Sequence, residues 1–340
     1  MYALRRQCLL AVYALLAFSL VACASDHASP EAQAARKAAA QELLVPGQII
    51  TGGWRAAGVD VNGFPLPGGM QGYAALVFPS ALAARGADIY IADSGAGKLY
   101  RFDAGTQSVN IMKDCGTFVK PVPCTDIPVV PWTRIQVGSD QSLYVLSADK
   151  RSILHYARGG QKLPTLNDPP ALTTTLDDFV VNGPLGRIVA SDSLNQRLVM
   201  FNPVGGPAWP MGHAGEGKFT SLGGLAGAGG TVYAIDSTCV CVVSMDDSGR
   251  ILARIGQGKL AQPKMLAVDR YGHIFVSDAV DRTLKVFLRG DLIASYTTQK
   301  LRLTEISALA VDGNTLYVAD GPSSRVLSFR IQKMESRAGD

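Results

Sequence analysis

Two close pairs of cysteines are the residues best suited to chemistry in this chain of 340 residues. Cys115 and Cys124 bracket a proline-containing segment, and a disulfide between them would tie down an exposed loop by restricting the unfolded chain. Cys239 and Cys241 are two residues apart, near the upper limit for a disulfide in a regular strand, although a turn would bring them closer. We predict the first disulfide. The second pair stays open between a small-ring, redox-labile disulfide, two thiols and pairing elsewhere.

The histidines are too few and too scattered to predict a metal centre. His155, His213 and His273 share no spacing that is typical of metal ligands. His213 lies in a glycine-rich run, residues 212–217, and we expect this loop to open on the same face as both cysteine segments. His213 is therefore a candidate residue of an interaction face, and the alternative is a solvated loop side chain.

These residues lie within a unit that recurs six times along the chain. A short apolar run ends at a polar anchor, crosses a turn and re-enters an apolar run, as in Leu316–Asp320 followed by Arg325–Phe329. The anchors are 42 to 54 residues apart, a period typical of propeller blades. They are Asp93, Ser147, Asp192, Asp236, Asp278 and Asp320. Asp at the end of a strand commonly accepts hydrogen bonds from turn amides, so we interpret the anchors as turn caps rather than metal ligands.

Each unit also has a short strand before this pair of runs and another after it. Examples are the leading run Ala308–Asp312 and the trailing run Leu292–Tyr296, which are rich in apolar residues and bounded by turn residues. Four strands in each of six units predict an all-β, six-bladed β-propeller over residues 48–331. The last unit lacks a trailing strand, and we expect Gln48–Gly52 to supply it beside Arg325–Ile331, closing the ring non-covalently.

The run Pro263–Asp269, followed by Tyr-Gly-His and then Ile274–Asp278, resembles the NHL-repeat propellers. The resemblance covers roughly residues 48–331 and implies the same fold. Propeller lyases related to this fold use a histidine-bound zinc, and this chain has too few histidines to match them.

A propeller has a central channel that is lined near the starts of the leading strands. Here those starts contribute the candidate channel residues Arg134, Asp177, Asp178, Lys264 and Glu305. Six-bladed lactonases of the regucalcin type hold a divalent cation in this channel, and the three acids resemble part of such a ligand set. The two basic residues would oppose a cation such as calcium or zinc, so the alternative is a set of internal salt bridges. We expect no cofactor, with a divalent cation as the less favoured possibility.

The first residues are typical of an export signal. Arg5 and Arg6 precede an apolar stretch, and the run Leu20 to Cys23 resembles the bacterial lipoprotein cleavage box. The resemblance implies removal of residues 1–22 and attachment of acyl chains such as palmitate to Cys23; the alternative is an ordinary secretory signal. Residues 23–47 are predicted to be an alanine-rich, partly helical tether, and residues 332–340 a C-terminal tail. Ala24 resembles the outer-membrane sorting pattern, so we expect an outer-membrane lipoprotein that faces the periplasm.

Charge argues against binding of nucleic acid. The chain has 32 Lys and Arg residues against 28 Asp and Glu, and loss of Arg5 and Arg6 would leave 30 − 28 = +2, without a basic cluster. We therefore expect a membrane-anchored binding or scaffold module for an envelope protein, peptide or glycan, and lean against an enzyme. The alternative is a metal-dependent hydrolase or lyase, such as a lactonase, that uses the channel acids.

Overall fold

A computed structural model of the chain describes residues 42–55, 72–167, 175–182, 186–192, 194–202, 209–211 and 222–332. The predicted signal, Cys23, most of the tether, His213 and residues 333–340 lie outside these ranges. Residues Pro46–Ile331 form one compact unit, and the rest of the chain forms a second one. Of that second unit, residues 42–45 and 332 are described, and the Gln332 amide donates to the Leu43 oxygen at 2.8 Å. In the described part of the chain, no helix has the length and apolar character needed to cross a bilayer.

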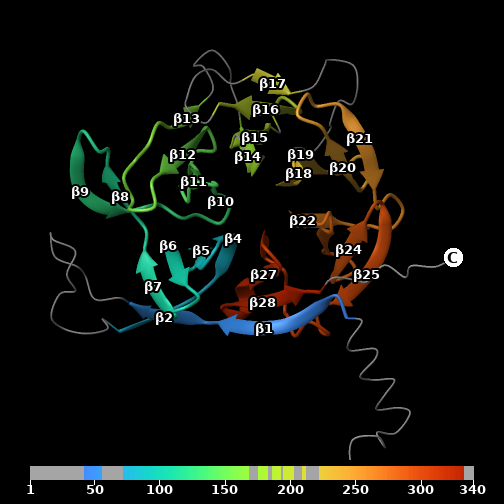
Figure 1. Cartoon of the computed structure of the whole chain (residues 1–340), viewed down its shortest axis with the longest axis horizontal. Coiled ribbons are helices and arrows are strands. Elements are labelled where there is room, and N and C mark those ends of the chain that lie inside the picture. The colour runs from blue at the N-terminus through green and yellow to red at the C-terminus, as the bar shows by residue number, and fades with distance from the viewer. Residues whose placement is uncertain are drawn as a thin grey trace, which may run out of the picture. The chain divides into compact units, whose positions relative to one another are not determined.

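The unit Pro46–Ile331 is an all-β, six-bladed propeller, as the repeat predicts (Figure 1). In blades 2 to 5 the sheet is antiparallel and its strands follow one another in space as in sequence. Blade 1 contains β4 (Pro79–Arg85), β5 (Asp88–Asp93), β6 (Lys98–Asp103) and β7 (Ser108–Ile111); blade 2 contains β10 (Ile135–Val137), β11 (Leu143–Leu146), β12 (Ser152–Tyr156) and β13 (Leu166–Asn167). Blade 3 contains β14 (Leu176–Asn182), β15 (Arg187–Asp192), β16 (Arg197–Phe201) and β17 (Trp209–Met211); blade 4 contains β18 (Leu222–Ala228), β19 (Thr231–Asp236), β20 (Cys241–Met245) and β21 (Ile251–Ile255).

Blade 5 contains β22 (Pro263–Val268), β23 (Ile274–Asp278), β24 (Thr283–Leu288) and β25 (Asp291–Thr297). Blade 6 contains β26 (Ala308–Asp312), β27 (Thr315–Asp320), the short 3-10 helix η1 (Gly321–Ser323), β28 (Arg325–Ile331) and β1 (Leu44–Ile50). The chain therefore closes its ring by adding its first described strand to its last blade, as expected. The Ser328 hydroxyl fixes this closure, because it accepts from the Gln48 amide at 2.7 Å and lies 3.3 Å from the Gln48 oxygen. Strand β1 begins at Leu44, so it includes four residues that the sequence assigned to the tether.

Blade 1 differs from the predicted four strands. Its sheet has six, because β2 (Gly52–Arg55) lies parallel to β7 and β3 (Tyr73–Ala75) pairs with β2. Between blades 1 and 2, the segment predicted as an exposed loop forms a separate two-stranded hairpin of β8 (Lys113–Gly116) and β9 (Pro121–Asp126). The repeat does not predict these additions, because they are absent from the described residues of the other five blades.

The recurrent Asp explains why the unit repeats. In blade 1, the Asp93 carboxylate accepts hydrogen bonds from the Val77 and Phe78 amides at 2.7 and 2.8 Å. Asp278 and Asp320 make the corresponding pairs of bonds in blades 5 and 6. A carboxylate at the end of the second strand thus fixes the segment that leads into the first strand, which supports the turn-cap interpretation over a metal site. We call this arrangement the Asp clamp.

Apolar packing between neighbouring blades supplies the core. One cluster joins buried side chains of blades 3 and 4, such as Val189, Leu198, Val232 and Val243, and a second cluster joins blades 4 and 5. Buried apolar area of this kind is the main stabilising term in folding. It makes the ring a rigid support for the turns and loops at its two ends.

Candidate functional site

One end of the ring carries the segments that lead into the first strands together with the turns between second and third strands. We call it the entry face; in the described residues it comprises 76–78, 130–134, 261–262, 304–307 and the turns 94–97, 148–151, 194–196, 237–240, 279–282 and 321–324. Hydrogen bonds connect these segments, as where the Ser324 hydroxyl donates to the Val77 oxygen at 2.6 Å. Exposed large apolar side chains gather here: Val77, Phe78, Trp132, Leu194 and Val280. The entry face thus carries exposed apolar side chains on blades 1, 2, 3 and 5.

Within the channel, the structure brings together two of the five predicted residues. The Nε atom of Arg134 lies 3.9 Å from Oδ1 of Asp178, and both side chains line a small cavity at the centre of the ring. A register shift between Leu176 and Asp178 turns the Asp178 side chain toward this cavity. Its carboxylate also accepts from the Phe179 and Leu225 amides, each at 2.8 Å. Asp178 therefore links blade 3 to blade 4.

The electrostatics of this carboxylate are set by opposing effects. Burial raises the pKa of Asp178, while the Arg134 guanidinium and the two amides oppose that rise. Asp177 does not join it, because its Oδ1 forms an ion pair with Lys150 Nζ at 3.0 Å.

This donor set does not fit a divalent cation. Both oxygens of Asp178 are engaged by amides, Arg134 adds positive charge, and Asp177 is paired with Lys150. Nowhere in the described ranges do three or more His, Cys, Asp or Glu side chains converge as metal ligands would. The likeness of the channel acids to a lactonase ligand set is therefore not matched by their geometry.

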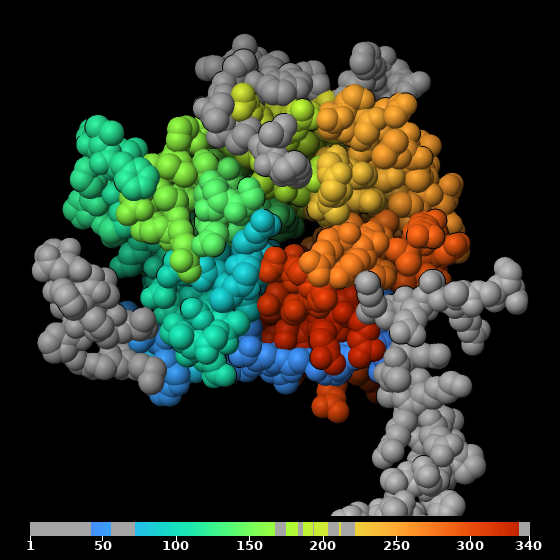
Figure 2. Space-filling model, viewed as in Figure 1, coloured from blue at the N-terminus to red at the C-terminus, as the bar shows by residue number. Residues whose placement is uncertain are grey.

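Lys264 and Glu305 line a separate pocket between blades 5 and 6. These blades lie side by side, orange and red in Figure 2, and the cavity has a volume of about 500 Å³. Its lining is mostly polar: Gln262, Lys264, Ser277, Asp278, Ala279, Arg282, Thr283, Thr298, Thr304, Glu305 and Ile306. The volume falls within the range of small-molecule and peptide sites. We call this cavity the blade 5–6 pocket.

Two Asp clamps build the walls of the blade 5–6 pocket. Asp278 holds the segment before β22 through the Ala261 and Gln262 amides, at 2.7 and 3.0 Å. Asp320 holds the opposite wall through the Thr304 and Glu305 amides, each at 3.1 Å. The lining residues that follow these amides are thereby fixed in position.

Arg282 completes the pocket wall, and Lys285 lies outside the lining, paired with Asp278. The Arg282 guanidinium crosses from blade 5 to donate to the Thr304 oxygen at 3.2 Å. Burial alone would raise the pKa of Asp278, but the Ala261 and Gln262 amides and the Lys285 ammonium together lower it. Asp278 is therefore a structural carboxylate, fully engaged by the protein itself.

Three other pocket residues keep polar groups free for a ligand. The Thr283 hydroxyl is buried and has no hydrogen-bond partner among the described residues. Lys264 and Glu305 are exposed, and neither forms an ion pair within the part of the chain that the structure describes. Besides the Arg282 guanidinium, the pocket thus presents one ammonium, one carboxylate and one unsatisfied buried hydroxyl.

Sequence reasoning missed Arg282 and Thr283. They follow the recurrent Asp278 by four and five residues, and that spacing was the available signal for placing them on the entry face.

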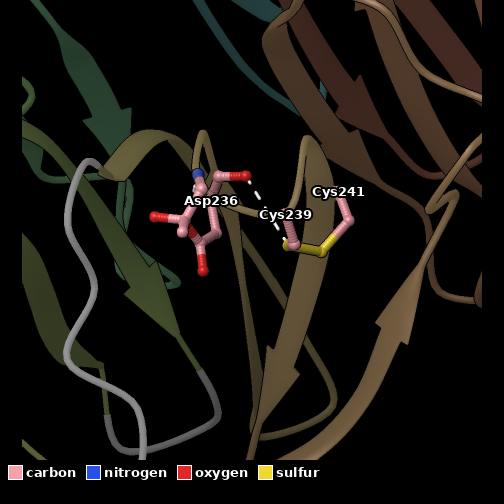
Figure 3. The surroundings of a disulfide bond; sticks show 4 residues. Asp236, Cys239 and Cys241 are labelled. Atoms are coloured by element: carbon pink, nitrogen blue, oxygen red, sulfur yellow. Dashed lines mark hydrogen bonds between the residues drawn. A yellow bond between two sulfur atoms is a disulfide. The ribbon is translucent and has the colours of Figure 1, made fainter.

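The two cysteine pairs lie at different ends of the propeller. Cys115 and Cys124 are joined in the β8–β9 hairpin, with Cα atoms 4.1 Å apart. The Cys115 amide donates to the Gly160 oxygen in the connection between β12 and β13, which is at the end of the ring opposite the entry face. Cys239 and Cys241 are joined across Val240 on the entry face, with Cα atoms 5.2 Å apart (Figure 3). The expectation that both cysteine segments share one face is therefore wrong.

No family model matches this sequence, and no curated protein matches it either. Solved structures do resemble the fold. A gluconolactonase from Xanthomonas campestris aligns with 86% of this chain and 98% of its own, at 15% identity and a TM-score of 0.56. A selenomethionine-substituted virginiamycin B lyase from Staphylococcus aureus aligns with 76% of this chain and 85% of its own, at 11% identity and a TM-score of 0.51.

A luciferin-regenerating enzyme aligns with 75% of this chain and 92% of its own, at 14% identity and a TM-score of 0.52. At these identities the likeness establishes the propeller fold and leaves the activity open. The structural neighbours include lactonase and lyase enzymes, so an enzymatic role is compatible with the fold.

Proposed function

We propose that this chain is a binding module that captures a polar, carboxylate-bearing peptide or glycan in the blade 5–6 pocket. The observation that carries the proposal is a cavity of about 500 Å³ in which Lys264 and Glu305 are exposed and form no ion pair among the described residues. The lining residue Thr283 adds a buried hydroxyl that has no partner among the described residues. A buried polar group without a partner is costly, and a ligand that supplies a hydrogen bond would remove that cost.

The charges around the pocket support this class of ligand. Lys264 contributes an ammonium and Arg282 a guanidinium, whereas Glu305 is the acid beside them that is not already engaged by the protein. A ligand carboxylate would bind near the two cations, and its hydroxyl or amide groups would bind near Thr283 and Glu305. An apolar ligand would leave these groups desolvated and unpaired.

The apolar side chains of the entry face suggest that the partner is larger than the pocket. Val280 is 66% exposed in the turn before Thr283, and Phe78 and Trp132 are exposed on other blades. Exposed aromatic and aliphatic groups on a rigid support are typical of interaction sites. The proposal is therefore an envelope polymer or protein whose polar end enters the blade 5–6 pocket.

We also propose that the module is held at the outer membrane by acylation of Cys23 and faces the periplasm. The run Leu20 to Cys23 supports this, as does the oxidising compartment that two close cysteine pairs would suit. Mass spectrometry of the mature N-terminus would test it, and an unmodified Cys23 would overturn it.

Binding can be tested with a glycan array and a library of carboxylate-terminated peptides, followed by calorimetry on any hit. Thr283→Val keeps the shape of the side chain and removes its hydroxyl, so we expect the affinity to fall about tenfold, as for one lost hydrogen bond. Lys264→Ala should reduce affinity further for ligands with a carboxylate. Arg289→Ala is the matched control, because it removes an exposed cation at the other end of blade 5. Equal affinities in all variants would refute the pocket.

A second candidate function is a hydrolase or lyase that uses Asp178. Burial raises the pKa of this carboxylate, and its side chain lines the central cavity; both features favour a general acid, which needs a pKa near neutral pH. Turnover of a panel of lactones and esters by wild type, with loss in Asp178→Asn, would support it. Metal analysis and melting curves in EDTA complete the test, because a stoichiometric ion that stabilises the fold would revive the cation hypothesis.

A further inference from the structure

The turn between β19 and β20 contains a disulfide on a backbone conformation that five of the six blades share. The residue directly before the third strand has a positive φ in blade after blade: Gly97, Gln196, Val240, Arg282 and Ser324 have values between 50° and 64°. This left-handed conformation is therefore a property of the blade and does not depend on the disulfide. In blade 4 the position is occupied by Val240, a β-branched residue that disfavours it.

Packing explains how the turn tolerates Val240. Its side chain packs against the apolar cluster between blades 4 and 5, while Cys239 and Cys241 pack against the cluster between blades 3 and 4. The two cysteines thus emerge on one side of the turn with Val240 on the other. Because both the turn and the packing hold them there, the sulfur atoms stay close together after the bond between them is reduced.

The two sulfur atoms differ in access. Cys239 is partly exposed on the entry face, whereas Cys241 is completely buried at the start of β20. An attacking thiolate from solvent therefore meets Cys239 first. The Sγ atom of Cys239 also lies 3.6 Å from the Asp236 backbone oxygen, as the dashed line in Figure 3 shows. A disulfide sulfur carries no hydrogen, so this contact becomes a hydrogen bond when Cys239 is a thiol.

We propose that Cys239 and Cys241 form a thiol–disulfide exchange site that oxidises pairs of cysteine thiols in extended polypeptides. A thiolate of the substrate attacks Sγ of Cys239; the Cys239–Cys241 bond breaks, and its electron pair leaves on Cys241, which takes a proton from water. The second substrate thiolate then attacks the substrate sulfur of the mixed disulfide and releases Cys239 as a thiolate. The substrate has lost two electrons and the turn has gained them.

Turnover requires an oxidant for the reduced pair. A second disulfide, from glutathione disulfide or from another protein, exchanges with the two thiols, restores the Cys239–Cys241 bond and leaves as two thiols. Each step is an exchange of sulfur partners, so no metal or flavin enters the scheme.

Exposed apolar side chains indicate why the substrate would be an extended polypeptide. Leu194 and Val280 are exposed in the equivalent turns of blades 3 and 5, on either side of the Cys239–Cys241 turn. Unfolded chains expose apolar residues next to their cysteines, and these two side chains offer contacts for them. The Cys115–Cys124 pair also lies beside exposed apolar side chains, Phe118, Val119 and Val122, but neither of its cysteines is buried as Cys241 is.

The first experiment compares the two pairs in the purified full chain. The protein is equilibrated in reduced and oxidised glutathione at graded ratios, quenched with acid, alkylated and mapped by mass spectrometry. We expect glutathione to be attached to Cys239 and at least tenfold less to Cys241, because Cys241 is buried; Cys115–Cys124 is mapped in the same digest as the reference. Equal attachment at Cys239 and Cys241, or a Cys239–Cys241 bond that stays oxidised at every ratio, would overturn the proposal.

The second experiment traps the intermediate with a synthetic, unstructured peptide that contains two cysteines and flanking leucines. Cys241→Ser should accumulate a mixed disulfide between the oxidised probe and Cys239, whereas Cys239→Ser should accumulate at least tenfold less because Cys241 is buried. Cys241→Ala, which suits the apolar surroundings, replaces Cys241→Ser if that variant fails to fold. The double variant Cys115→Ser/Cys124→Ser is the matched control and should oxidise the probe at the rate of wild type. Equal trapping at Cys239 and Cys241, or wild-type oxidation by Cys239→Ser, would refute the exchange site.

Discussion

Blades 2 and 5 build the same four-stranded sheet with different polar groups. In blade 5, Asp278 clamps two amides and pairs with the buried Lys285 at 3.0 Å, and Asp269 pairs with the buried His273 at 2.7 Å. In blade 2, Ser147 stands at the clamp position. His155, also buried, has no partner for either ring nitrogen in the described part of the structure. The comparison shows that the apolar strand pattern is sufficient for a blade.

The clamp instead determines how precisely the entry segment is held. Ser147 bonds within its own turn, since its hydroxyl donates to Asp149 at 2.6 Å and accepts from the Ser152 amide at 3.0 Å. The entry segment of blade 2 is held by Thr133, whose hydroxyl accepts from the Val130 amide at 2.9 Å. Blade 5 uses its clamp to build a wall of the blade 5–6 pocket. The clamp carboxylate of blade 5 thus lies in the pocket where we propose that the ligand binds.

The largest effect is expected from Asp278→Ala, which removes the clamp of blade 5. It leaves Lys285 buried beside a single carboxylate, Asp281, and frees two amides, so we expect a loss of about 3–5 kcal/mol in the free energy of unfolding. Chemical denaturation measures it. If blade 5 tolerated the change as blade 2 tolerates Ser147, with a loss below about 1 kcal/mol, the clamp would be dispensable everywhere.

Two controls sharpen this result. Asp281→Ala removes the exposed partner of Lys285, and we expect it to cost less than about 1 kcal/mol. Adding Lys285→Met to Asp278→Ala removes the unpaired buried ammonium and should recover part of the lost stability. A double variant less stable than Asp278→Ala would show that the clamp acts through the amides alone.

His273→Phe is expected to have the second largest effect. The imidazole Nδ1 bonds Asp269 Oδ2 at 2.7 Å, and both side chains are buried. Phenylalanine would fill the space but leave a buried carboxylate oxygen unpaired, so we expect a loss of about 2 kcal/mol. The same denaturation series at neutral pH checks it. A neutral or stabilising outcome would mean that Asp269 is already satisfied by the Tyr271 and His273 amides.

The sequence could predict most of the fold from these repeating features. The apolar runs and their anchors predicted six blades and the closing strand, because each copy has the same apolar strand pattern and a polar anchor at the same position. The strands β2 and β3 were missed, since they are separated by residues 56–72 and occur in one blade. Pairing between distant strands in a single blade produces no repeat in the sequence.

The candidate site was less predictable. Asp177 and Asp178 are adjacent, and a one-residue register shift decides which of them faces the channel. The blade 5–6 pocket depends on the Arg282 guanidinium reaching a backbone oxygen of the next blade, a contact that depends on three-dimensional placement.

His155→Phe tests the other side of the comparison and should act in the opposite direction to His273→Phe. The imidazole stacks on Tyr144, with ring centroids 4.0 Å apart, and a phenyl ring can keep that contact. The substitution removes two buried nitrogens that lack partners, so we expect a gain of about 1 kcal/mol in the free energy of unfolding. A loss of stability instead would indicate that His155 has a partner, such as an ordered water.

The smallest effect is the pH dependence of His155. Burial lowers the pKa of this imidazole below its usual 6.5, although Asp140 opposes the shift. Above pH 6.5 the imidazole is neutral in both states and contributes no pH dependence. As the pH falls below 6.5, the unfolded chain binds a proton that the folded chain resists, so stability decreases until the folded pKa is passed. At pH 6 the loss should be below about 1 kcal/mol, and it should vanish in His155→Phe. His155→Phe also affects Asp140, but the pKa of that carboxyl is lowered from its usual 3.8, so Asp140 titrates below the pH range of interest. Between about pH 5 and 7 the difference between the two denaturation curves therefore isolates the histidine of blade 2, and a constant difference would show that His155 keeps its normal pKa.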